Sequence, residues 1–118
     1  MARDLSHLTD EAFCYLTTIG RVSGRPHTIE IWFALKGSTL YLLSGNMDRA
    51  DWVKNAWRQS EVTVRIREMV LPGQARPVSE LAEDALARQL IEEKYQKVEE
   101  DLDEWLKRAL PVAVDLVG

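Results

Sequence analysis

Hydrophobic and polar residues alternate along much of the chain, and a period of two residues is typical of half-buried strands. The predicted strands are 13–19, 27–35, 39–45, 61–68, an interrupted strand at 69–79, and 111–117. In the second of them, the apolar Ile29, Ile31 and Phe33 would share one face. Lys36-Gly37-Ser38 predicts a tight hairpin into the third strand. Pro72-Gly73 predicts a turn or bulge in the fifth.

The hydrophobic period changes to that of a helix after the third strand. Ala50, Val53 and Ala56 lie at helical spacing, which predicts a helix over about 48–59. Its N-cap would be Asn46 or Asp48, because both side chains can accept a hydrogen bond from the first turn. Earlier in the chain, Thr9-Asp10-Glu11 predicts a short helical turn ahead of the first strand.

A second helical segment is predicted from Ser79, with Ser79 as the cap and acidic residues in the first turn. A break near Gln96 or Glu99 would divide the segment into two helices. Its apolar stripe consists of Leu86, Leu90, Ile91, Tyr95, Val98, Leu102, Trp105 and Leu106. The pattern therefore predicts one α+β domain over residues 1–118, in which antiparallel strands form a small barrel-like sheet with one inserted helix.

Composition and charge narrow the class of protein. The formal net charge is −4, but residues 21–76 carry nine Lys or Arg against five Asp or Glu, and the excess of acid lies mostly after residue 79. Nucleic-acid-binding domains are usually basic overall, so the charge argues against that partner and leaves room for a small anion. The sequence shows no apolar run long enough to span a membrane, and its start is charged rather than signal-like, so a cytoplasmic protein is expected.

Few residues offer nucleophilic or metal-binding chemistry. The single cysteine, Cys14, excludes an internal disulfide and fits a reducing compartment. Cys14 lies in a predicted strand, where a lone cysteine is usually buried and inert, and pairing with His7 or His27 is the less favoured alternative. No spaced cluster of His, Asp and Glu predicts a metal site. The sequence therefore identifies no catalytic residue.

The loop between the first two strands is the better candidate for a binding site. Gly20 and Gly24 allow a tight turn whose backbone N–H groups can face an anion. Arg21 and Arg25 can bind a phosphate or carboxylate through two parallel hydrogen bonds. Hydroxyl donors are available from Ser23 and Thr28. The alternative is a plain hairpin turn with two solvated arginines.

A second polar loop leads from the third strand into the helix. Its residues Ser44, Gly45, Asn46 and Arg49 are followed on the helix by Trp52 and Lys54. A polar loop that ends at a helix is a favourable place for phosphate. If the first three strands are neighbours, both loops would face one site. Trp32, on a mostly polar face, would form a ligand wall or a subunit interface.

At these residues the chain resembles a known family. TTIGRVSGRPHTIEIWF, followed by LYLLSGNMDRADWVKN, is similar to the deazaflavin-dependent nitroreductases and quinone reductases, a family of flavin-reductase-like, pyridoxamine phosphate oxidase-like split β-barrels. The tail ALPVAVDLV is similar to the closing strand of that family. Two positions differ from the family pattern. Val22 stands in place of a basic residue, and Ala50-Asp51 stands in place of His-Pro.

The resemblance implies an FMN-binding-type split barrel that forms a homodimer and binds coenzyme F420, a deazaflavin, near the subunit interface. Arg21, Ser23, Gly24, Arg25 and Thr28 would hold the phosphate or tail of the cofactor. The ring and ribityl side would be lined by Ser44, Gly45, Asn46, Arg49, Trp52, Lys54 and Asn55. The implied activity is hydride transfer from the reduced deazaflavin to a small organic acceptor such as a quinone or nitro compound. The alternatives are an FMN-binding reductase or oxidase of the same fold and a non-enzymatic dimeric module that binds flavin or an anion.

Overall fold

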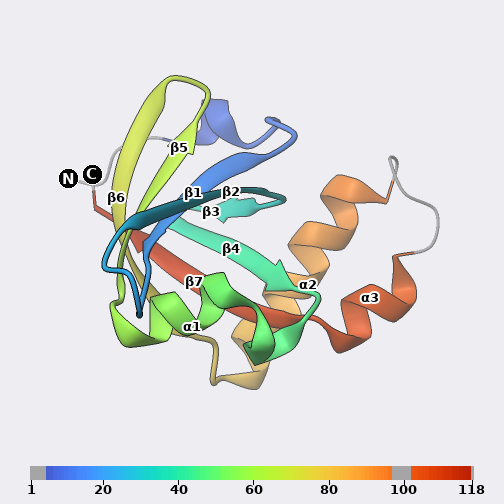
Figure 1. Cartoon of the computed structure of the whole chain (residues 1–118). Helices are drawn as coiled ribbons and strands as arrows, with labels where there is room; N and C mark the ends of the chain where they lie inside the picture. The colour runs from blue at the N-terminus through green and yellow to red at the C-terminus, as the bar shows by residue number, and fades with distance from the viewer. Residues whose placement is uncertain (1–4, 97–101, 118) are drawn as a thin grey trace.

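The computed structural model describes residues 5–96 and 102–117, and a curled antiparallel sheet forms its centre (Figure 1). The strands are β1 (Cys14–Ile19), β2 (Pro26–Ile31), β3 (Ala34–Lys36), β4 (Thr39–Ser44), β5 (Glu61–Ile66), β6 (Met69–Pro77) and β7 (Leu110–Leu116). The helices are α1 (Asp51–Arg58), α2 (Leu81–Tyr95) and α3 (Asp103–Arg108), with 3-10 turns η1 (Ser6–Leu8) and η2 (Met47–Arg49).

The strands form one seven-stranded sheet in the order β2-β1-β5-β6-β7-β4-β3, and every neighbouring pair is antiparallel. The sheet curls into a half-barrel, so the predicted α+β split β-barrel is confirmed. The predicted neighbourhood of the first three strands is confirmed, because β1 pairs with β2 and β3 pairs with β4, and β2 and β3 are the two parts of the predicted strand 27–35. The strand β4 also pairs with β7.

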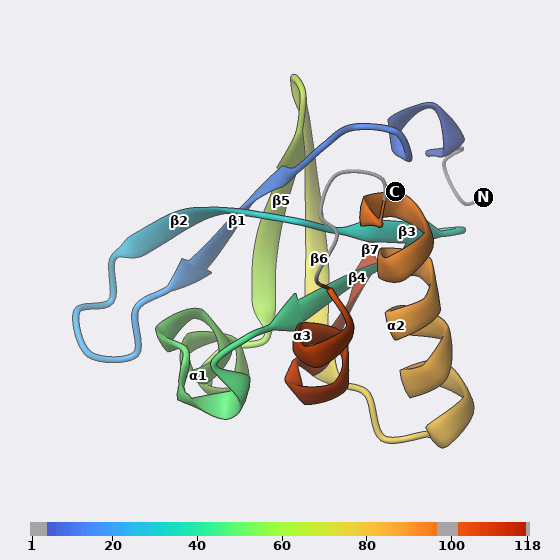
Figure 2. The ribbon, with the colours of Figure 1, turned by 90° about the vertical axis from the view of Figure 1, so that its right-hand side faces the viewer.

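Two layers of side chains pack on the sheet. The inner layer fills the half-barrel, with Leu16, Val64 and Val114 from the sheet and Val53 from α1. Figure 2 shows α2 and α3 on the side of β3, β4 and β7, while α1 lies beneath the loop that joins β1 to β2. Strands β4 and β7 are buried on both faces, which explains their nearly continuous apolar sequences.

The predicted strand 27–35 is broken between β2 and β3, at Trp32 and Phe33. The backbone N–H of Phe33 donates to the Tyr95 hydroxyl at 3.1 Å, and its carbonyl accepts from Lys94 Nζ at 2.9 Å. The Trp32 ring stacks on Tyr95 with 4.1 Å between ring centroids. Contacts with α2 therefore replace strand pairing at this point. The hairpin at Lys36-Gly37-Ser38 is confirmed, because Lys36 pairs with Thr39 and Gly37 has a φ of 62°.

The predicted interruption at Pro72-Gly73 is wrong, because β6 continues through both residues, paired with β5. The Pro72 carbonyl accepts from the backbone N–H of Val117, just beyond the end of β7. In an antiparallel sheet, the N–H and C=O groups of one residue point toward the same neighbouring strand. The N–H that Pro72 lacks would therefore point toward Val117, which lies beyond the last residue of β7, so the proline interrupts no pairing within β7. At Gly73 an added Cβ would lie 2.6 Å from Val114 Cγ1, so close packing against β7 requires glycine.

The predicted helices exist, but their starts differ. The caps assigned to Asn46, Asp48 and Ser79 are wrong, because α1 begins after Ala50 and α2 after Glu80, neither with a side-chain cap bond. The turn expected at 9–11 is η1, three residues earlier, and Thr9 Oγ1 donates to the Ser6 carbonyl at its end. Helix α2 ends at Tyr95, as the predicted break near Gln96 required, whereas Val98 and Glu99 lie outside the described residues.

A network of charged side chains fastens α2 to the sheet. Arg76 on β6 donates to both carboxylate oxygens of Glu83 on α2, at 2.7 and 2.8 Å, and to Asp115 on β7 at 2.7 Å. The Tyr41 hydroxyl on β4 donates to Glu83 at 2.7 Å. Hydrogen bonds from Arg76, which have the larger effect, and from Tyr41 lower the pKa of the Glu83 carboxyl to about 2. The network joins three strands to one helix.

In the part of the chain that the structure describes, no helix has the length and apolar character needed to cross a membrane.

Candidate functional site

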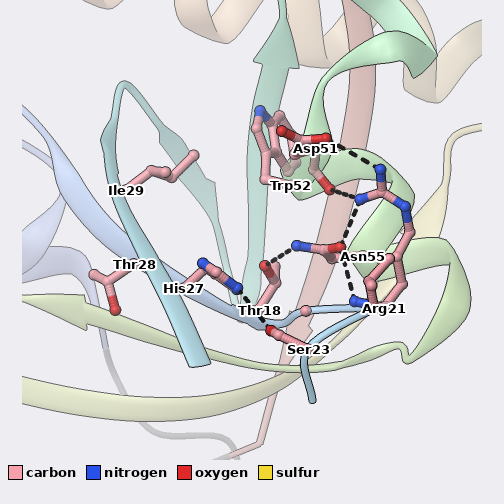
Figure 3. A pocket seen from close by; sticks show the side chains of 11 residues that line it. Thr18, Arg21, Ser23, His27, Thr28, Ile29, Asp51, Trp52 and Asn55 are labelled. Carbon is pink, nitrogen blue, oxygen red and sulfur yellow. Dashed lines mark hydrogen bonds and ion pairs between the residues drawn. The ribbon is translucent and has the colours of Figure 1, made fainter. Parts of the chain in front are cut away.

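The loop between β1 and β2, the start of β2 and helix α1 enclose a cavity of about 510 Å³ (Figure 3). The loop is tight because Gly20 N–H donates to the Arg25 carbonyl at 2.8 Å and Gly24 N–H donates to the Gly20 carbonyl at 2.9 Å. The cavity is lined by Thr18, Gly20, Arg21, Val22, Ser23, His27, Thr28, Ile29, Asp51, Trp52 and Asn55. Two elements distant in sequence thus build one pocket, with polar and apolar side chains in its lining.

Arg21 connects the loop to α1. Its Nη1 donates to Asn55 Oδ1 at 2.8 Å, and its Nη2 donates to Asp51 Oδ1 at 3.1 Å. The same Asn55 oxygen accepts from the Arg21 backbone N–H at 3.1 Å, while Asn55 Nδ2 donates to Thr18 Oγ1 at 3.3 Å. Asn55 is buried, so these bonds satisfy an amide that water does not reach. Figure 3 shows this chain of bonds from Thr18 to Asp51 along one wall of the cavity.

A second pair of polar side chains lines the same cavity, Ser23 from the loop and His27 from the start of β2. Ser23 Oγ lies 3.2 Å from His27 Nε2 and accepts from the Arg25 backbone N–H at 3.2 Å. An added Cβ on Gly20 would lie 2.6 Å from Ser23 Oγ and 2.7 Å from His27 Nε2, so the glycine leaves room for both. Gly24 has a φ of 72°, a conformation that favours glycine. The loop sequence therefore serves the shape of the pocket as well as the turn.

A second cavity of about 510 Å³ lies on the other side of Trp52. It is lined by Ile29, Glu30, Ile31, Leu43, Ser44, Gly45, Asn46, Ala50, Asp51 and Trp52. Ile29, Asp51 and Trp52 line both cavities, so the two adjoin. Ser44 Oγ donates to the Met47 carbonyl at 2.8 Å and fixes the loop that leads into α1. Residues of the loop 20–28 and of the segment 44–46 thus line two adjoining cavities that share Trp52.

Residues 5–117 match the family of F420H2-dependent quinone reductases. The chain belongs to this family. Similar solved structures include an F420-H2-dependent reductase, with 21% identity, a TM-score of 0.71 and coverage of 90% of this chain and 94% of that one. A FAD-binding protein from Mesorhizobium loti has 18% identity and a TM-score of 0.71, covering 94% and 83%. A structure described as a domain-swapped dimer has 20% identity and a TM-score of 0.72, covering 92% and 81%. At these identities the likeness shows the fold. No curated protein gives a significant match.

In this member of the F420H2-dependent quinone reductase family, the structure brings together eight of the predicted site residues. Arg21, Ser23, Thr28 and Asn55 line the first cavity, Ser44, Gly45 and Asn46 line the second, and Trp52 lines both. Gly24, Arg25, Arg49 and Lys54 line neither. Arg25, Arg49 and Lys54 are exposed, and their side chains have no partner among the described residues.

Trp32 does not fit its predicted place beside the cavity. Its ring stacks on Tyr95 and meets Trp105 edge to face, with 5.8 Å between centroids, so it packs between β2 and the helices α2 and α3. The prediction used alternation along one continuous strand, and the break at Trp32 and Phe33 ended that alternation. Trp32 therefore belongs to the packing of α2 in this structure.

The sequence did not point to Thr18, His27 and Ile29 in the first cavity or to Glu30, Ile31 and Leu43 in the second. Gly20 was expected to shape the loop, and Val22, Ala50 and Asp51 differ from the family pattern, but none of the four was assigned to the cofactor. Strand pairing holds the signal for two of the residues that the sequence did not point to, since Thr18 on β1 lies opposite His27 on β2. Opposed residues point to the same face, so the register places both side chains beside α1.

Cys14 lies in β1, fully buried among the side chains of the inner core. Burial raises the pKa of its thiol to about 12. The expectation that this cysteine is buried is confirmed, and a thiol of this kind is a poor nucleophile near neutral pH.

Proposed function

We propose that this protein is an oxidoreductase that transfers a hydride from reduced coenzyme F420, a deazaflavin, to a small organic acceptor such as a quinone or a nitro compound. The observation that carries the proposal is the family match over residues 5–117, which includes every residue that lines the two adjoining cavities. When bound, the reduced deazaflavin supplies the hydride, and the acceptor gains that hydride and a proton.

The donors of the first cavity fit an anionic phosphate or tail. Arg21 brings a guanidinium whose orientation is fixed by Asn55. Ser23 and His27 bring a hydroxyl and a ring nitrogen on the opposite wall, with their mutual contact at 3.2 Å. Charge-assisted bonds of this type are the strong contacts in phosphate recognition. We assign Arg21, Ser23 and His27 to the anionic part of the cofactor.

The wall shared by the two cavities fits a flat aromatic ring. Trp52 and Ile29 present apolar surface there, and both are only partly buried in the chain itself. Ligand pockets for cofactors combine such apolar walls with a few well-placed polar groups. Asn46 and Ser44 supply the polar groups of the second cavity. We assign Trp52 to the ring and the loop 44–46 to its polar edge, where the side chains orient the ring and exclude water.

Homodimerisation belongs to the same proposal. The strand β2 is an edge strand of the sheet, and edges left open invite pairing or need cover. Ile29 and Ile31 on β2 are only partly buried and line the second cavity, so a partner subunit placed there would enclose the cofactor. Light scattering after size-exclusion chromatography tests for the homodimer. We expect a mass of twice 13.5 kDa, and a monomer at micromolar concentration would contradict the proposed dimer.

The activity test uses purified protein, reduced F420 and two acceptors, menadione and a nitroaromatic compound. Oxidation of the cofactor is followed by the return of its absorbance. We expect turnover with at least one acceptor and micromolar binding of F420. The variant Trp52→Ala should weaken binding, because it removes the apolar wall, whereas Trp57→Ala on the same helix serves as a matched control outside both cavities. Absence of F420 binding by the wild type refutes the proposal.

An FMN-dependent reductase or oxidase is the second candidate. One observation favours it: the Arg21 guanidinium is already paired with Asp51, which leaves less positive charge for the longer anionic tail of F420. The same titration with FMN distinguishes the two candidates. Binding of FMN without binding of F420 selects the second.

A further inference from the structure

Asp51 is an acid at the centre of a site proposed to bind an anion. Among the described residues that line the first cavity, Arg21 is the one permanently cationic side chain and Asp51 is the one carboxylate. Val22, the next residue in the loop, is 92% exposed and uncharged. The two formal charges on the cavity wall therefore cancel.

The contacts of Arg21 show which of its partners can be displaced. Asn55 is 4% exposed and accepts two hydrogen bonds from Arg21, one from the backbone and one from Nη1. The Asp51 side chain is 86% exposed and accepts a single bond from Nη2, at 3.1 Å. A buried amide with several bonds holds its place, while an exposed ion pair contributes little and exchanges readily with other anions. Asn55 thus positions the guanidinium, and the Asp51 carboxylate accepts one hydrogen bond from Nη2.

We propose that Asp51 is an internal competitor for the anionic group of the ligand, and that it determines how strongly the site distinguishes phosphate-bearing from phosphate-free flavin-type molecules. The inference rests on the proposed function, because it takes the ligand to be such a cofactor. A ligand phosphate that takes the Arg21 Nη2 hydrogen bond now made to Asp51 replaces the carboxylate there. It must also remain near that negative charge, since Asp51 lies on the wall of both cavities.

The inference predicts the ligand class that the site accepts. A phosphate bound at Arg21 gains one guanidinium and meets one carboxylate, so each further negative charge on the ligand adds repulsion without a second permanently cationic partner among the described lining side chains. The site should therefore bind flavin-type cofactors with few anionic groups, and affinity should fall as the anionic tail lengthens. Removal of the Asp51 charge should reverse this order.

The test measures binding by tryptophan fluorescence with three probes: F420, a deazariboflavin that lacks the phosphate, and inorganic pyrophosphate. The variants are Asp51→Asn, Asp48→Asn, Arg21→Ala and Arg21→Ala/Asp51→Asn. Asp48 is an exposed acid on η2 that lines neither cavity, so it controls for a general change in charge. Asp51→Asn should bind F420 and pyrophosphate about three- to tenfold more tightly at low salt. The phosphate-free probe and Asp48→Asn should show less than a twofold change.

The outcomes separate this inference from the proposed function. If the wild type binds F420 and Asp51→Asn binds it equally well, the inference is overturned while the proposed function stands. If neither protein binds F420 but Asp51→Asn binds pyrophosphate more tightly, the competition at Arg21 holds and the deazaflavin assignment fails. A gain that persists in the Arg21→Ala background would show general repulsion instead of competition, and would overturn the inference as well.

Discussion

Replacement of Glu83 by glutamine should lower stability near neutral pH and have a smaller effect in acid. The Glu83 carboxylate accepts from Arg76 through two nitrogens and from the Tyr41 hydroxyl, at 2.7 to 2.8 Å. These bonds lower the pKa of Glu83 from 4.5 to about 2, and the bonds from Arg76 have the largest effect. A group with a lowered folded-state pKa contributes stability above its unfolded pKa and loses it as the pH falls through the folded value.

The magnitude follows from the size of that change. A pKa lowered from 4.5 to about 2 is equivalent to about 3 kcal/mol of unfolding free energy between neutral pH and pH 2. The Arg76 side chain is 37% exposed, so solvent screens the pair and we expect about 1–2 kcal/mol instead. More than half of this contribution should be lost by pH 3.

Urea denaturation at pH 7 and pH 3, followed by the fluorescence of the four tryptophans, measures the effect. Glu83→Gln should be less stable than wild type by about 1–2 kcal/mol at pH 7, and the difference should shrink at pH 3. Tyr41→Phe removes one of the three bonds and should have a smaller effect of about 1 kcal/mol at pH 7. Glu80→Gln, an exposed acid next to the same helix end, is the control. An equal loss for Glu83→Gln at both pH values would refute the reasoning.

Three further predictions follow from contacts in the core and the site. Gly73→Ala should destabilise the protein by about 1–3 kcal/mol in urea denaturation, because its Cβ would lie 2.6 Å from Val114 Cγ1; an unchanged midpoint would contradict the close packing of β6 on β7. Asn55→Ala should cost about 1–3 kcal/mol of stability and speed proteolysis of the loop 20–25, since it leaves a buried network unsatisfied, whereas the exposed Gln59→Ala should change neither. Cys14, with its thiol pKa raised to about 12 by burial, should react with a thiol reagent at pH 8 only after unfolding, and rapid labelling of the native protein would contradict its burial.

The strands could be predicted from the local sequence, because the alternation of apolar and polar residues shows which side chains face a core. This alternation does not depend on which strand is the partner. The hairpin at Lys36-Gly37-Ser38 was equally accessible, since turn chemistry lies within three residues. Pairing between distant strands was not accessible in this way. The neighbour of β4 is β7, and Thr39 lies opposite Asp115, a separation that leaves no mark on the local sequence.

The candidate site shows the same division. Gly20, Gly24, Arg21 and Ser23 predict a loop that can bind an anion. The place of Trp52 beside the cavity was predicted from the order of the sequence segments. Trp32 was misplaced because its packing depends on Tyr95, a residue on a helix that begins fifty residues later in the chain. The sequence placed the acid Asp51 near the expected anion site, but its bond to Arg21 could not be predicted, because only the folded helix brings the two side chains together.

The position of β7 between β6 and β4 also sets the order in which the protein can fold. Strand β4 ends at Ser44, but its neighbour β7 begins only at Leu110. The apolar side chains Leu40, Leu42 and Leu43 therefore lack this neighbour until most of the chain has been synthesised. During synthesis the half of the sheet formed by β1, β2, β5 and β6 can assemble first, because the last of these four strands ends at Pro77 and the pairs β1–β2 and β5–β6 are local in sequence. Until β7 arrives, the exposed edge of β4 is the segment most open to wrong pairing, and chaperone binding or aggregation of nascent chains should concentrate there.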